Sequence, residues 1–70
     1  MNEIEAGVTR VRRFIAQQPK WSKFRLASAA GLHRNTLRDL DSPNWNPRIE
    51  TVRLAVAAIE RIERAAVEAA

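Results

Sequence analysis

Apolar residues fall in four groups along the chain, and proline, glycine or polar turn residues separate the groups. The first group recurs at helical spacing: Ile4, Val8, Val11 and Ile15. Residues at this spacing lie on one face of a helix. Asn2 is suited to cap that helix, Glu5 completes a capping box, and Pro19 prevents its continuation. The first helix is therefore predicted over residues 3–17.

The second and third groups predict two short helices joined by a tight turn. Ser22 is a favourable N-cap, and Trp21 with Leu26 has the spacing of a hydrophobic staple. The second helix is predicted to run to about residue 30, where Gly31 supplies the left-handed conformation that ends many helices. Leu32 follows as a contact to the core. A third helix is predicted to restart near residue 33 or 34 and to reach Leu40.

The fourth group predicts the longest helix. The segment 41–47 contains two prolines, two asparagines and a serine, so it forms a turn. Asn46 is expected to cap the last helix and Pro47 to occupy its first turn. This C-terminal helix is predicted over about 47–68. The sequence has no strand pattern and no repeat, so the predicted fold is a single all-α domain, 1–70, a small bundle of four main helices.

The junction between the second and third helices has its own spacing pattern. Two helices that cross at a tight turn need a small residue at the crossing, a residue that tolerates positive φ in the turn, and an apolar residue facing the core. Ala27, Gly31 and Leu37 meet these needs at spacings of four and six. Residues 22–41 therefore resemble the helix-turn-helix of the phage-repressor family of DNA-binding domains, which includes lambda repressor and Cro. The order of the predicted helices extends the resemblance over most of residues 3–65.

The resemblance implies that a recognition helix, about 34–41, enters the major groove of double-stranded DNA. Its outward residues would contact bases: His33, Arg34, Asn35, Thr36 and Arg38. Arginine binds guanine, and asparagine binds adenine, through two hydrogen bonds. His33 stands where the family usually has a small capping residue, so its ring is equally able to cap the third helix.

Contacts to DNA phosphates are expected around the second helix and at the start of the last one. The candidates are Lys20, Ser22, Lys23, Arg25 and Arg48. The chain has 12 Lys and Arg against 8 Asp and Glu, and its formal net charge is +4. Nine of the 12 cationic residues lie in residues 1–48, so the excess positive charge coincides with the predicted motif. Such contacts dominate affinity for DNA without reading its sequence.

Several polar and aromatic residues have simpler interpretations. Arg10, Arg12 and Arg13 are expected to be solvated on the polar side of the first helix. Asp39 would repel phosphate, so it is expected to pair with Arg38 or Arg34. Trp45 is expected to hold the turn segment against the core.

Other classes of function fit the sequence poorly. The chain has no cysteine and one histidine, so we expect no disulfide, no metal site and no cofactor. No catalytic set of residues is recognisable, and we expect no enzymatic activity. The longest apolar run is far shorter than the about 20 residues that span a bilayer. The N-terminus lacks a basic region followed by an apolar block, so a cytoplasmic, nucleoid-associated protein is expected.

One helical module offers limited contact area on DNA, so a homodimer or a protein partner is expected. The proposed dimer face is a flank of the last helix: Leu54, Ala58, Ile62 and Ala65. The alternative function is a helical protein-interaction module that docks on RNA polymerase or another protein. The two hypotheses differ in salt dependence, because DNA binding weakens steeply with ionic strength.

Overall fold

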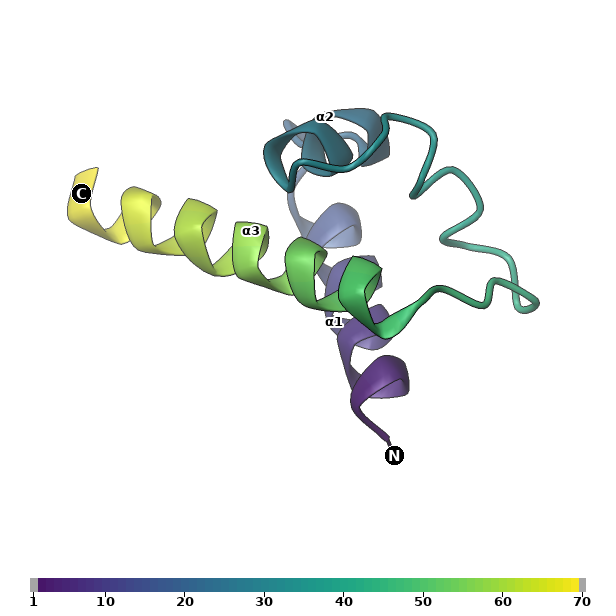
Figure 1. Ribbon diagram of the computed structural model, residues 1–70. Helices are drawn as coiled ribbons and strands as arrows, with labels where there is room; N and C mark the ends of the chain where they lie inside the picture. Colours follow the sequence, from purple (N-terminus) through teal and green to yellow (C-terminus); the bar gives the residue numbers. More distant parts are fainter. Residues whose placement is uncertain (1, 70) are drawn as a thin grey trace.

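The computed structural model describes residues 2–69 and contains three helices in that range (Figure 1). They are α1 (Glu3–Gln17), α2 (Lys23–Ala29) and α3 (Ile49–Ala69). None of the described residues forms a strand. The predicted all-α class is therefore confirmed, whereas the predicted number of four helices is wrong.

The helix starts of α1 and α2 follow the predicted capping chemistry. Asn2 Oδ1 accepts a hydrogen bond of 2.8 Å from the backbone N–H of Glu5. Ser22 Oγ accepts one of 3.0 Å from the backbone N–H of Arg25. Each side chain satisfies a backbone donor that has no partner inside its helix. The bounds of α1 agree with the predicted 3–17.

The end of α2 is a Schellman motif centred on Gly31. Gly31 has φ of 75° and donates its N–H to the carbonyl of Ser28 at 3.1 Å. Leu32 donates to the carbonyl of Ala27 at 2.9 Å and packs against the core. This pair of bonds closes the helix and reverses the chain. The predicted helix end and the predicted turn are both confirmed.

The predicted third helix is absent, and residues 33–42, the connecting segment, form a succession of tight turns instead. Its backbone bonds join each donor to the carbonyl three residues earlier: Thr36 to His33, Arg38 to Asn35, Leu40 to Leu37, and Ser42 to Asp39. Asn35, Thr36 and Asp39 are weak helix formers, because their side chains compete for backbone groups. A helix of about eight residues is also too short to be stable by itself.

The last helix begins two residues later than predicted. Its first backbone bond runs from the N–H of Val52 to the carbonyl of Arg48 at 3.2 Å, so Pro47 lies outside the helix. Asn46 is exposed and does not occupy the cap position. Trp45 is half-buried and packs against the core, so its predicted role in holding the turn segment is confirmed.

The core lies where α3 crosses α1 and α2 (Figure 1). Twelve buried side chains form it: Val8, Val11, Phe14, Leu26, Ala27, Ala30, Leu37, Leu40, Val52, Ala55, Ala58 and Ile59. Gly7 lies where α1 packs against α3, and a Cβ atom there would be 2.0 Å from Val52 Cγ1. No local pattern in the sequence marks this glycine, yet its lack of a side chain lets α1 and α3 pack at their present distance.

The C-terminal part of α3 extends beyond the rest of the molecule (Figure 1). Val67, near its end, is 76% exposed. Among residues 2–69, no helix combines the length and the apolar composition needed to cross a membrane.

Candidate nucleic-acid interface

The connecting segment presents its polar side chains outward and buries its leucines. His33, Arg34, Asn35 and Arg38 are exposed, and Thr36 is half-buried. Leu37 and Leu40 are completely buried. In turns with bonds between residues three apart, side chains three residues apart point the same way. The leucine spacing that suggested a helix therefore also fixes the orientation of these turns.

The first turn of the segment is organised by His33. Its carbonyl accepts the N–H of Thr36 at 2.9 Å. Its ring Nδ1 accepts the backbone N–H of Asn35 at 3.2 Å. The ring thus takes the capping role considered for it, although it caps a turn. In the neutral ring, this bond assigns the hydrogen to Nε2.

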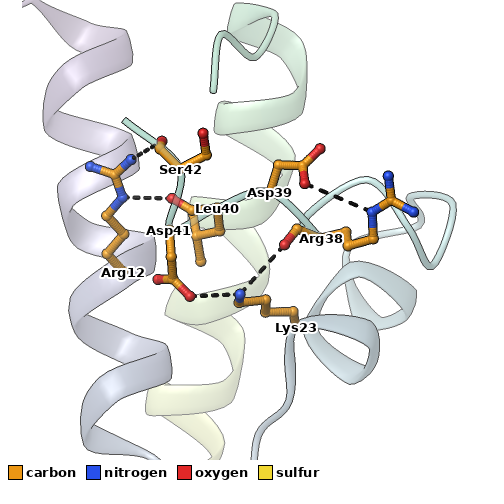
Figure 2. Close-up of polar contacts among 7 residues, drawn as sticks. All are labelled: Arg12, Lys23, Arg38, Asp39, Leu40, Asp41 and Ser42. Carbon is orange, nitrogen blue, oxygen red and sulfur yellow. Dashed lines mark hydrogen bonds and ion pairs between the residues drawn. The ribbon is translucent and has the colours of Figure 1, made fainter. Parts of the chain in front are cut away.

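Arg12 joins the end of the segment to α1 (Figure 2). Its Nε donates to the carbonyl of Leu40 at 2.7 Å, and its Nη2 donates to the carbonyl of Ser42 at 3.1 Å. The expectation that Arg12 is simply solvated is therefore wrong. The carbonyls of Leu40 and Ser42 lie outside any helix, and the guanidinium supplies their hydrogen-bond donors. Such charge-assisted bonds are stronger than neutral ones.

Lys23 makes the second attachment, from the start of α2 (Figure 2). Its Nζ lies 2.6 Å from Asp41 Oδ2 and donates to the carbonyl of Arg38 at 3.4 Å. The side chain is 28% exposed. Lys23 was expected to contact phosphate, but its ammonium group is occupied within the domain. Lys23 and Arg12 are called the two tethers below.

Arg38 faces outward, and Figure 2 shows its guanidinium on the opposite side of the segment from Arg12. Its Nε lies 3.8 Å from Asp39 Oδ1, so the expected pairing of Asp39 is confirmed. Both side chains are largely exposed. An exposed pair at this distance contributes little to stability, and Arg38 remains available to a ligand.

The other predicted phosphate contacts surround α2 and the start of α3. Lys20 and Arg48 are exposed, while the Ser22 hydroxyl serves as the N-cap. Arg25 is exposed, donates to the carbonyl of Lys20 at 3.0 Å and lies 4.3 Å from the ring centre of Trp21. Trp21 packs against the core, and its ring centre lies 6.1 Å from that of Phe14.

Two ion pairs place other arginines away from this surface, between α1 and α3. Arg53 binds Glu3 through hydrogen bonds of 2.8 and 3.2 Å, and Arg10 binds Glu63 at 2.8 Å. The hydrogen bonds from Arg53 lower the pKa of Glu3 below its ordinary value. The same contact raises the pKa of Arg53. Positive charge is thus partly neutralised on this side of the molecule.

The proposed dimer face is only partly exposed. Ala58 is 1% exposed and belongs to the core of its own domain, so its assignment to that face is wrong. Leu54 is 46% exposed, Ala65 is exposed and Ile62 is half-buried. Ala58 faces inward because α3 buries a wider arc than the stripe through Val52 and Ile59.

Three residues near the interface were missed or misjudged from the sequence. Arg12 and Asp41 act through contacts between distant segments, which local spacing does not reveal. Phe24 is 51% exposed and lies beside Arg34 and Asn35. Its exposure was predictable from helical spacing. Leu26, Ala27 and residue 30 form the apolar face of α2, and Phe24 lies off that face.

Comparisons of the chain with protein families, with curated proteins and with solved structures give no significant match.

Proposed function

We propose that this domain binds double-stranded DNA sequence-specifically and regulates transcription, with the connecting segment in the major groove. The supporting observation is the composition of its exposed side. His33, Arg34, Asn35 and Arg38 project from a short segment whose buried leucines and two tethers hold it against the helices. Because these contacts fix the backbone of the segment, its outward side chains are positioned to contact a ligand.

The chemistry of the outward side chains matches base edges. Arg34 has the donors for guanine O6 and N7, and Asn35 has the donor and acceptor for adenine N7 and N6. Thr36 and Arg38 extend the contact along the segment. The major groove, about 12 Å wide, admits an α-helix, and a succession of turns with bonds three residues apart is narrower than an α-helix. The connecting segment can therefore enter the major groove without forming a recognition helix.

Phosphate contacts in this proposal come from Lys20, Arg25 and Arg48. All three are exposed, and none is within ion-pair distance of a carboxylate among residues 2–69. Two other predicted phosphate contacts are left out, because Lys23 already binds Asp41 and the Ser22 hydroxyl caps α2. Nonspecific attraction to phosphates steers the domain to DNA, and the base contacts select the site.

The proposed DNA-bound form is a homodimer. A single module of this size covers few base pairs, and two-fold symmetric sites increase both affinity and specificity. Leu54, Ala65 and the half-buried Ile62 remain the candidate contacts on α3. Sedimentation of the free protein and of the DNA complex measures the stoichiometry directly.

The test is selection of bound sequences from a random duplex library at about 0.15 M salt, the physiological ionic strength. We expect a recovered motif in which Arg34→Ala relaxes the preference at one base pair. Arg64→Ala is the matched control, since Arg64 is exposed towards the projecting end of α3. Failure to enrich any sequence would contradict the proposal.

A protein-interaction module is the second candidate, and the projecting end of α3 favours it. Ala65 and Val67 are exposed there without contributing to the core. Apolar docking of this kind depends weakly on salt, whereas DNA binding depends on it steeply. A partner bound by α3 and insensitive to Arg34→Ala would support this second candidate instead.

A further inference from the structure

Phe24 is a large apolar side chain that the core does not use. It is 51% exposed at the second position of α2, while the core-forming residues of that helix, Leu26 and Ala27, are completely buried. Exposing half of this side chain to water is unfavourable, because the free energy of apolar surface is higher in water than in an apolar environment. Phe24 therefore stabilises the folded domain less than a phenylalanine buried in the core would.

The surroundings of Phe24 are the outward residues of the connecting segment. The ring lines a shallow depression together with Arg34 and Asn35. These two side chains supply hydrogen-bond donors and acceptors, and Phe24 supplies an apolar wall beside them. The depression thus combines polar groups that match base edges with one apolar surface.

We infer that Phe24 contacts the C5 methyl group of a thymine, in the base pair next to those bound by Arg34 and Asn35. The inference depends on the proposed DNA binding and deepens it by assigning one base of the site. The thymine methyl is the only apolar group that base edges present in the major groove, and phenylalanine is one of the side chains suited to contact it. Phe24 would therefore determine specificity through apolar contact.

The experiment replaces thymine by deoxyuridine, one position at a time, in a duplex that the full chain binds. This exchange removes the methyl group and leaves every base-pairing and hydrogen-bonding atom unchanged. We expect one position at which deoxyuridine weakens binding about fourfold, the value for removing one buried methyl-sized group. At that position, 5-methylcytosine opposite guanine would recover part of the affinity lost with unmethylated cytosine.

Variants of the protein connect that effect to Phe24. In Phe24→Ala, thymine and deoxyuridine are expected to bind equally at the sensitive position, while the remaining sequence preference persists. Phe24→Leu keeps an apolar contact and should retain part of the discrimination. Val67→Ala is the matched control, because Val67 is also an exposed apolar residue but lies near the end of α3, and it should keep the full fourfold difference.

The outcomes separate this inference from the proposed function. Specific binding in which deoxyuridine is tolerated at every position would overturn the thymine contact and leave DNA binding intact. The same holds for a deoxyuridine effect that persists unchanged in Phe24→Ala. The absence of any specific DNA binding would overturn both. Circular dichroism of each variant confirms that a changed affinity does not arise from unfolding.

Discussion

Gly7 faces Val52 of α3 with no room for a side chain, and its replacement gives a test at the scale of one residue. An alanine Cβ at this position would be 2.0 Å from Val52 Cγ1, far inside van der Waals contact. Alanine favours a helix over glycine by about 1 kcal/mol, but overpacking costs about 1–3 kcal/mol. We therefore expect Gly7→Ala to lower the free energy of unfolding, as measured by urea denaturation.

A second substitution identifies the cause of that loss. Val52→Ala removes the clashing methyl groups and should itself destabilise the core. In this background, Gly7→Ala is expected to be neutral or stabilising, because the helix preference of alanine is no longer opposed. A double-mutant cycle measures this coupling. Additive effects of the two substitutions would show that the contact with Val52 does not explain the requirement for glycine.

At the scale of elements, the two tethers, Arg12 and Lys23, attach the connecting segment to α1 and α2 in the absence of a third helix. Arg12→Met removes the hydrogen bonds to the carbonyls of Leu40 and Ser42. Hydrogen bonds to charged groups contribute about 1.5–3 kcal/mol. Because Arg12 is only half-buried, we expect a loss within this range for the two bonds together in the free energy of unfolding. Hydrogen exchange should accelerate in residues 33–45 before it does in α1 and α3.

Arg13→Met is the matched control for this element. Arg13 is the neighbouring arginine on α1 and is exposed. Surface substitutions away from specific contacts change stability by about 0.5 kcal/mol or less. Equal effects of the two substitutions, or uniform acceleration of exchange in every element, would contradict a local role for Arg12.

Local signals in the sequence predicted the elements whose ends are determined locally. Asn2, Ser22 and Gly31 act through bonds to residues close in sequence, so α1, α2 and the turn after α2 were predicted correctly. The connecting segment was not, because Leu37 and Leu40 are spaced for either a helix or tight turns. The outward orientation of its polar residues was nevertheless correct, since the buried leucines determine it in both conformations.

Contacts between distant segments account for the remaining differences. Lys23 and Asp41 are 18 positions apart, and Arg12 is 28 positions from Leu40. Nothing in local spacing distinguishes an arginine that binds such a carbonyl from one that is solvated. The same reason applies to Gly7, whose role depends on where α3 crosses α1.

For the whole molecule, the ion pair between Glu3 and Arg53 makes stability depend on pH. The pKa of Glu3 is lowered in the folded state by its hydrogen bonds with Arg53. The unfolded chain therefore binds a proton at higher pH than the folded chain, and the stabilisation is present above the ordinary pKa of about 4.5. It is lost as the pH falls through the lowered pKa.

Thermal unfolding of the wild-type protein and of Glu3→Gln, compared from pH 7 to pH 3, checks this prediction. The wild type should have the higher Tm at pH 7, by a small margin because the pair is exposed. The margin should shrink as the pH falls, because a protonated Glu3 no longer pairs with Arg53. A margin that stays constant over this range would contradict the assignment.

The distribution of free positive charge predicts how the whole molecule responds to salt. Binding that releases counterions from phosphates gives a linear fall of log K with log salt concentration, with a slope of about 0.9 for each phosphate neutralised. Lys20→Gln should reduce this slope by about 1 and lower affinity evenly across DNA sequences. Arg64→Gln carries the same charge change towards the projecting end of α3 and should leave the slope unchanged. Titrations between 50 and 200 mM salt measure both slopes, and equal reductions would mean that charge acts through the net total and that no particular face is turned towards DNA.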